Sequence, residues 1–305
     1  IAEPASVPGF SATSYYFAYA LRQDLKQPVG VIVSSIGGTR AEAWGPKGVY
    51  DEVPEAKGWE EKEAAAVAAR AEKRDPKNPP VWSNGPHMNW NGMIYPLIGY
   101  TFKGALWYQG ESNAGKGEDY KWVLGAMIKS WHKDWGSDFP FMIVQLPRFM
   151  AKKPLPVEEG WAKIRESMEW IADNVPGAMR TVNIDLGDEK DIHPKDKLEI
   201  GERLAALALE RVYKVREVGS APRVVAAKLQ GDAWVLTYDR PVVLRGEGKG
   251  FAVLAADGKW SFAQAKADGK TVTVSAEGVK APTEVRYAWA NFPEVSVYSA
   301  GADAL

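Results

Sequence analysis

The chain has 305 residues, of which 46% are hydrophobic and 25% charged, proportions that are typical of globular proteins and exclude disordered and fibrous classes. Its 38 basic and 39 acidic side chains give a formal net charge of -1, so it lacks the excess positive charge that binding to nucleic acid requires. There is no Cys, which excludes disulfides, thiolate zinc sites and a cysteine nucleophile. The length suggests about two domains.

Metal and membrane signals are missing as well. His87, His132 and His193 lie too far apart in the sequence for a HExxH-type metal pair, so we expect no metal site and no cofactor. No stretch approaches the roughly 18 apolar residues of a membrane span. The chain opens with Ile-Ala-Glu-Pro, without Met and without the pattern of a signal peptide, so we expect it to have been trimmed.

Strand-length apolar runs alternate with amphipathic stretches as far as about residue 215, a pattern typical of βα units and a parallel sheet. The expected elements, in chain order, are a helix at 11–26, a strand at 29–34, a helix at 59–74, a strand at 104–109, a helix at 119–135, a strand at 139–146, a helix at 158–174, a strand at 179–185 and a helix at 195–213. Beyond about residue 218, short alternating segments separated by Gly-containing turns indicate antiparallel strands. We therefore expect an α/β domain over residues 1–216 and an antiparallel β module over 217–305.

The loops after the predicted parallel strands are the first places to look for a site, because ligands bind beyond the carboxyl ends of such strands. Polar, Gly-containing loops follow three of them, at 34–44, 108–113 and 185–194. In the third loop Asp191 lies two residues before His193, where an acid can orient an imidazole for general-base catalysis. Alternatively, Asp191 caps the following helix and His193 is a solvated loop residue.

The other two loops offer hydrogen-bond donors. The backbone N–H groups at Gly37 and Gly38 suit an oxyanion, although a Gly pair also makes ordinary turns. Gln109 is a polar residue at the end of an apolar strand, where its amide can donate to a developing negative charge. The alternative is a hydrogen bond that ties two loops together.

Four ordered segments of the chain resemble the sialate O-acetylesterases, which are SGNH-type hydrolases close to carbohydrate acetyl esterases such as acetylxylan esterase. They are residues 28–44 (PVGVIVSSIGGTRAEAW), 91–97 (NGMIYPL), 104–114 (GALWYQGESNA) and 191–195 (DIHPK), followed by Gly201, Arg203 and Leu204, and the resemblance extends to 285–291 (VRYAWAN). It implies a flavodoxin-like parallel sheet flanked by helices. It also implies metal-free hydrolysis of an O-acetyl ester on a sugar by a serine nucleophile.

The resemblance also implies roles for single residues. His193 is the expected general base and Asp191 its acid, although the wider superfamily has its acid three residues before the base, where this chain has Lys190, which leaves the acid open. Oxyanion donors are expected from the residues Gly37, Gly38 and Gln109, the last in a place that many relatives fill with Asn. Ser112 takes the third position of their Gly-x-Asn pattern, and supporting roles are expected for Glu111 and Asn113.

The family's nucleophile lies in a Gly-Gln-Ser-Asn motif after the first strand of the sheet, and this sequence contains no such motif. A base and oxyanion donors without a nucleophile cannot form an acyl-enzyme. We therefore expect an N-terminal fragment of the same precursor to supply the serine and the first strand. That strand would pair with an apolar sheet edge that is otherwise exposed. Ser34 and Ser35 are the alternative nucleophiles within the chain, although they lack a Gly-x-Ser-x-Gly elbow.

The 13 Trp and 12 Tyr suit a sugar-binding protein, although most of these rings should be core. Expected sugar contacts, chosen beside the polar loops, are Arg40, Trp44, Trp82, Trp90, Asn91 and Tyr108. The planar guanidinium of Arg40 suits the carboxylate of sialic acid, and the alternative is an ion pair with Glu42.

The expected substrate is acetylated sialic acid, with acetylated xylan or another acetylated glycan as alternatives. A second hypothesis is a carbohydrate-binding protein without a nucleophile that uses the same pocket. The resemblance implies an exported protein, whether periplasmic, secreted or lysosomal.

Overall fold

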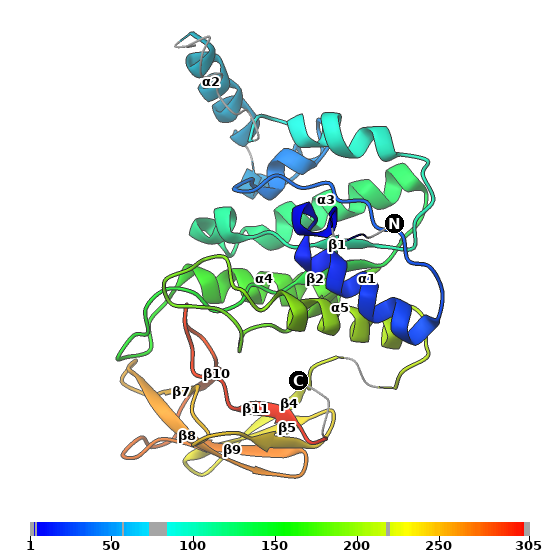
Figure 1. Cartoon of the computed structure of the whole chain (residues 1–305). Helices are drawn as coiled ribbons and strands as arrows, with labels where there is room; N and C mark the ends of the chain where they lie inside the picture. The colour runs from blue at the N-terminus through cyan, green and yellow to red at the C-terminus, as the bar shows by residue number, and fades with distance from the viewer. Residues whose placement is uncertain (1–2, 4, 57, 73–83, 218–219, 302–305) are drawn as a thin grey trace. The chain divides into compact units, whose positions relative to one another are not determined.

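The computed structural model describes residues 3, 5–56, 58–72, 84–217 and 220–301 (Figure 1). The chain divides into two compact units: the first comprises the described parts of 1–31, 147–162 and 181–305, and the second those of 32–146 and 163–180. Helices give way to antiparallel strands after residue 211, close to the predicted boundary at residue 216. The compact units nevertheless group the antiparallel strands with helices from both ends of the α/β segment.

The second unit contains most of a three-stranded sheet in the order β1-β2-β3, formed by β1 (Ala105–Trp107), β2 (Phe141–Val144) and β3 (Ala178–Thr181). β1 and β2 are parallel, as predicted. The helices of this region are α3 (Tyr120–Trp135) and α4 (Gly160–Asn174). Trp131 of α3 lies edge-on to Phe141 of β2, with ring centroids 5.8 Å apart, so the apolar face of α3 covers the sheet. The predicted α/β class is confirmed, with strands shorter than expected.

The strand predicted at 29–34 is wrong. Residues 28–36 adopt no regular structure, and Ile32 and Val33 are 54% and 41% exposed. A strand is held by hydrogen bonds to a neighbour, and among the described residues this segment has no strand beside it. The apolar run is therefore a segment without regular structure that pairs with no described strand. β1 likewise pairs with β2 alone among the described strands, so its other edge is open.

Helix α2 (Trp59–Glu72) matches the predicted helix at 59–74 as far as the described residues go. Short helical turns occupy several loops: η1 (Val7–Gly9), η2 (Ala41–Trp44), η3 (Pro54–Ala56), η4 (Trp90–Ile94), η5 (Tyr95–Leu97) and η6 (Glu111–Lys116). The sequence patterns did not predict these turns. Two of them, η2 and η6, overlap the polar loops at 34–44 and 108–113.

The first unit pairs the helices α1 (Ala12–Leu25) and α5 (Lys197–Arg211), which lie side by side (Figure 1). The Ser11 hydroxyl caps α1 by accepting the Ser14 N–H at 3.3 Å. At Gly201 the helices approach so closely that a Cβ atom would lie 2.6 Å from the Cβ of Tyr16. Gly201 therefore makes close packing of α5 on α1 possible, and both predicted helices are confirmed within one or two residues.

The predicted antiparallel module is confirmed. Its main sheet has six strands in the order β10-β7-β8-β9-β5-β4, and a second sheet pairs β11 with β6. The strands are β4 (Val224–Gln230), β5 (Ala233–Tyr238), β6 (Val242–Leu244), β7 (Phe251–Leu254), β8 (Trp260–Asp268), β9 (Thr271–Ser275), β10 (Glu284–Tyr287) and β11 (Val297–Ser299). Alternate residues such as Leu236, Val272 and Val274 form the core of this module.

Within the described part of the chain, no helix is long and apolar enough to cross a membrane. The same residues include no cluster of three or more His, Asp or Glu side chains that could hold a metal ion.

Candidate active site

The loop between β3 and α5, in the first unit, carries the predicted base and acid. Asp191 Oδ1 accepts the backbone N–H of His193 at 2.8 Å, and the same oxygen lies 3.7 Å from the imidazole Nδ1 of His193. The side chain of His193 is 86% exposed. The carboxylate thus lies beside Nδ1, the nitrogen that an orienting acid faces, but at a distance longer than a hydrogen bond.

Other carboxylates hold this loop in shape. Asp188 accepts the backbone N–H of Lys190 at 2.7 Å and that of Asp191 at 3.2 Å. The Lys190 N–H is the main reason why the pKa of Asp188 lies below its ordinary value. Asp196, just before α5, accepts the N–H of Gly187 at 3.2 Å. These local hydrogen bonds fix the turns of the loop, which contains no helix or strand.

Arg203 of α5 ties the start of the same loop to the helix. Its guanidinium binds both carboxylate oxygens of Asp185, at 2.7 and 2.8 Å, and also donates to the Val182 carbonyl at 2.9 Å. The two side chains are only 11% and 16% exposed. A bidentate, largely buried pair of this kind fixes direction as well as distance. It anchors the chain between β3 and the segment that carries His193.

Gln109, in the second unit, lies at the centre of a buried hydrogen-bond network. Its Nε2 donates to the Thr39 carbonyl at 3.0 Å and to Asn113 Oδ1 at 2.8 Å. Its Oε1 lies 2.9 Å from the hydroxyl of Tyr120, which itself accepts the indole N–H of Trp107 at 3.0 Å. Burial raises the pKa of Tyr120 far above its ordinary value, so the phenol stays protonated and donates.

In this arrangement both N–H groups of the Gln109 amide have partners. This is the alternative role considered for Gln109, in which its hydrogen bonds tie two loops together. To serve as an oxyanion donor, the amide has to exchange one of these bonds for the ligand. The oxyanion role of Gln109 stays a prediction.

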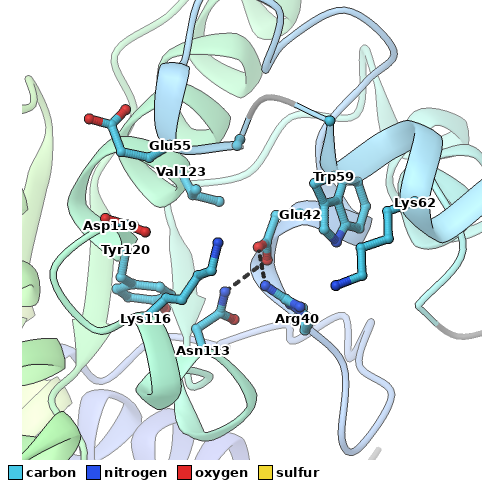
Figure 2. Close-up of a pocket in the computed structure, with 12 residues that line it drawn as sticks. Arg40, Glu42, Glu55, Trp59, Lys62, Asn113, Lys116, Asp119, Tyr120 and Val123 are labelled. Carbon is cyan, nitrogen blue, oxygen red and sulfur yellow. Dashed lines mark hydrogen bonds and ion pairs between the residues drawn. The ribbon is translucent and has the colours of Figure 1, made fainter.

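The network continues through Asn113 to an ion pair of the buried Glu42 with the half-buried Arg40 (Figure 2). Asn113 Nδ2 donates to Glu42 Oε2 at 2.8 Å, and Asn113 Oδ1 also accepts the Ala41 N–H at 3.1 Å. Glu42 Oε1 accepts from the Arg40 guanidinium at 2.8 Å, so the ion pair considered as an alternative role for Arg40 is present. Asn113 thus joins the segment at residues 41–42 to its own segment at 109–113, and its supporting role stays a prediction. Glu111 is half-buried at the start of η6.

Gly37 and Gly38 form an exposed turn in the second unit. Gly38 has φ +73°, a left-handed conformation that favours glycine, and nothing lies within 4 Å of the position that its Cβ would take. Asn84 fixes the far side of the turn: it accepts the Arg40 N–H at 2.8 Å and donates to the Gly38 carbonyl at 3.2 Å. The turn is therefore open to a ligand, and its oxyanion role stays a prediction.

The predicted sugar contacts divide into buried and accessible groups. Trp44 and Trp90 are core residues, each 3% exposed, so neither ring presents a face to a sugar, contrary to the expectation. The Trp44 indole instead donates to the Thr39 hydroxyl at 3.0 Å. Tyr108 is half-buried and Asn91 is exposed. Trp82 lies outside the described residues.

Ser34 and the other two histidines have structural partners. The Ser34 hydroxyl donates to the Met93 carbonyl at 3.2 Å, and Ser35 is exposed. Buried His87 places Nδ1 2.8 Å from the Gly45 carbonyl. His132 places Nε2 3.0 Å from the Phe139 carbonyl, and burial is the main reason why its pKa lies below the ordinary value.

Comparisons with known proteins point to one family. Residues 88–210 match the family model of the carbohydrate esterases described as sialic acid-specific acetylesterases. The predicted resemblance to the sialate O-acetylesterases is confirmed. The matched segment contains both Gln109 and the loop with Asp191 and His193.

Curated relatives extend the similarity over most of the chain. The sialate O-acetylesterase of Rattus norvegicus is 28% identical over 93% of this chain and 59% of its own length. The human sialate O-acetylesterase is 27% identical over 93% of this chain and 56% of its own length. The chain therefore spans somewhat more than half the length of these relatives. A crystal structure of a carbohydrate acetylesterase from Xanthomonas citri matches with a TM-score of 0.81 at 32% identity, over 96% of this chain and 64% of that one.

Proposed function

We propose that the chain is the main part of a carbohydrate O-acetyl ester hydrolase, most simply a sialate O-acetylesterase. The observation that carries the proposal is the match of residues 88–210 to the sialic acid-specific acetylesterases, because this segment includes the Asp191–His193 loop. The geometry of that loop agrees, since an exposed imidazole with a carboxylate held beside Nδ1 is what a general base requires.

In the proposed mechanism, His193 Nε2 takes the proton of a serine hydroxyl while the serine oxygen attacks the acetyl carbonyl. The negative charge on the resulting oxyanion is stabilised by N–H groups at Gly37 and Gly38 and by the Gln109 amide. The sugar hydroxyl leaves with the proton from His193, and an acetyl-enzyme remains. Water, activated by the same imidazole, then releases acetate and restores the serine. Asp191 holds the ring and stabilises its protonated form.

We infer that the serine comes from a segment outside these 305 residues. Two observations support this inference: β1 has an open edge among the described strands, and Ile32 and Val33 of the unpaired 28–36 segment are exposed. A strand that bears the nucleophile would give both segments a partner and would cover apolar surface. Ser34 is a poorer nucleophile candidate because its hydroxyl donates to the Met93 carbonyl rather than to a general base.

Labelling with a fluorophosphonate, followed by intact mass and peptide mapping, tests where the serine lies. The 305-residue chain should stay unlabelled, while the complete protein should be labelled on a serine outside this chain and should release acetate from O-acetyl sialic acid. Labelling of Ser34 or Ser35, abolished by His193→Ala, would contradict this part of the proposal. Acetate release from acetylxylan but not from O-acetyl sialic acid would identify the alternative substrate.

The carbohydrate-binding alternative predicts no acetate release from the complete protein while glycan binding persists. Export to the periplasm, the exterior or a lysosome is part of the proposal, and fractionation of the source cells tests it.

A further inference from the structure

A bridging segment (residues 147–162) connects two parts of the first unit that lie far apart in the sequence. At the start of the loop that carries the proposed base, the Leu186 carbonyl accepts the Arg148 N–H at 3.0 Å. At the end of the antiparallel module, the Asn291 carbonyl accepts the Phe149 N–H at 3.1 Å. Two consecutive peptide groups of the bridging segment therefore join the antiparallel module to the loop of the base.

Asn291 uses all of its polar groups in this contact. Besides the carbonyl, its Oδ1 accepts the Trp161 N–H at 3.1 Å, and its Nδ2 donates to Glu159 Oε1 at 3.0 Å and to Met150 Sδ at 3.2 Å. The other oxygen of the same carboxylate, Glu159 Oε2, accepts the backbone N–H of Asn291 at 2.5 Å. Asn291 and Glu159 are each 9% exposed. A buried network of satisfied polar groups favours one arrangement of the chain, so this contact fixes the bridging segment against the module.

The contact between the bridging segment and the loop is tight as well. Gly187 has φ +110°, and a Cβ atom there would lie 2.2 Å from the Arg148 carbonyl oxygen. The Gly187 N–H donates to the Asp196 carboxylate at 3.2 Å. Close-packed groups transmit displacements, so a shift of the Arg148 backbone moves the start of the loop. The imidazole of His193 is 86% exposed, and its place therefore depends on where the ends of the loop are held.

We propose that Asn291 and Glu159 are positioning residues for the general base. They set the place of the bridging segment, and the bridging segment sets the place of the loop that carries His193. Because both residues are buried, they act through the loop and not on the substrate. The inference rests on the proposed function, in which His193 is the base. It makes the antiparallel module a part of the catalytic machinery and not a separate accessory domain.

The direction of the buried hydrogen bond allows a sharp test. Asn291→Asp exchanges the amide for a carboxylate beside that of Glu159, so the hydrogen bond is lost and two like charges face each other. In Asn291→Asp/Glu159→Gln the bond is restored in the reverse direction, because the amide now belongs to residue 159. The amide oxygen at 159 still accepts the N–H of residue 291, and the carboxylate at 291 still accepts the Trp161 N–H.

The first measurement is acetate release from O-acetyl sialic acid by the complete protein. We expect Asn291→Asp to lower kcat about 10- to 100-fold with KM changed less than about twofold, because a misplaced base affects the chemical step. The double variant should recover most of the lost kcat. Glu284→Gln, at an exposed glutamate of β10 in the same module, is the matched control and should leave kcat unchanged. If Asn291→Asp does not fold, Asn291→Ser replaces it, since it removes the amide without adding a charge.

The second measurement uses the 305-residue chain and needs no activity. The chain has three histidines, so their ring proton signals can be separated by NMR, and His193→Ala identifies the signal of His193. We expect Asn291→Asp to shift or broaden that signal and the double variant to restore it. The signals of His87 and His132, which lie in the second unit, should stay in place.

An unchanged kcat in Asn291→Asp would overturn the proposal, and so would an unchanged His193 signal. A loss of kcat that the double variant does not recover would overturn it as well, because a general folding defect gives that result. If the parent protein releases no acetate, the proposed function fails, and the His193 signal then decides separately whether Asn291 holds the loop.

Discussion

Replacing Arg203 by Met should loosen the loop that carries the proposed base. The change removes three hydrogen bonds to Asp185 and Val182 and leaves the Asp185 carboxylate, 16% exposed, without its cation. Losing one partner of a buried ion pair costs about 3–5 kcal/mol, and partial access to water should reduce this to about 2–3 kcal/mol here. In the double variant Arg203→Met/Asp185→Asn no unpaired charge remains, so a coupling energy of about 2 kcal/mol is expected.

Because the chain has two compact units, one global unfolding midpoint is a poor measure of this effect. Hydrogen exchange of peptides from residues 182–203 measures it locally. Lys259→Met is the matched control, since Lys259 and Asp257 form an ion pair whose side chains are 81% and 56% exposed and which should therefore contribute little to stability. Equal exchange in Arg203→Met and Lys259→Met would refute the reasoning. So would a double variant whose effect is the simple sum of those of Arg203→Met and Asp185→Asn.

The other predictions concern helix packing, pH and the oxyanion. Gly201→Ala should destabilise by about 1–3 kcal/mol because its Cβ would meet Tyr16 at 2.6 Å. Gly125→Ala in α3, where the nearest atom is 3.6 Å away, should instead stabilise by about 0.5–1 kcal/mol, and hydrogen exchange of peptides from α5 and α3 compares the two. The lowered pKa of His132 means that the unfolded chain binds more protons, so stability is complete above about pH 6.5 and is lost as the pH falls through the window below it. His132→Gln should reduce this loss of stability at low pH, as measured by denaturation at several pH values. An unchanged dependence of the free energy of unfolding on pH would contradict the prediction. In the complete protein Gln109→Ala should lower kcat about 100-fold with little change in KM, and steady-state kinetics that show only a KM effect would remove its oxyanion role.

Local sequence patterns predicted the helices well because their signals are local. Ser11 at the start of α1 and the change to short alternating segments after residue 218 are visible in a few residues each. The strand at 29–34 failed for the opposite reason: its apolar run is strand-like, but a strand exists only with a neighbour, and the sequence does not show which neighbours are present.

The candidate site shows the same division. The family motifs pointed to Gln109 and His193, yet no local signal showed that Tyr120, eleven residues further on, would occupy the Gln109 amide oxygen. Trp44 and Trp90 were expected at a sugar because they flank Gly-rich loops. Large aromatic side chains contribute most free energy to folding when they are buried, however, and both lie in the core.

Acetate release from O-acetyl sialic acid by the complete protein and its His193→Ala variant tests the central claim most directly. If His193 is the general base, the variant should fold normally, as judged by circular dichroism, and its kcat should fall about 1000-fold or more. The 305-residue chain without the serine segment should release no acetate above background. A His193→Ala variant that retains more than about a tenth of the activity, or robust hydrolysis by the 305 residues alone, would contradict the account.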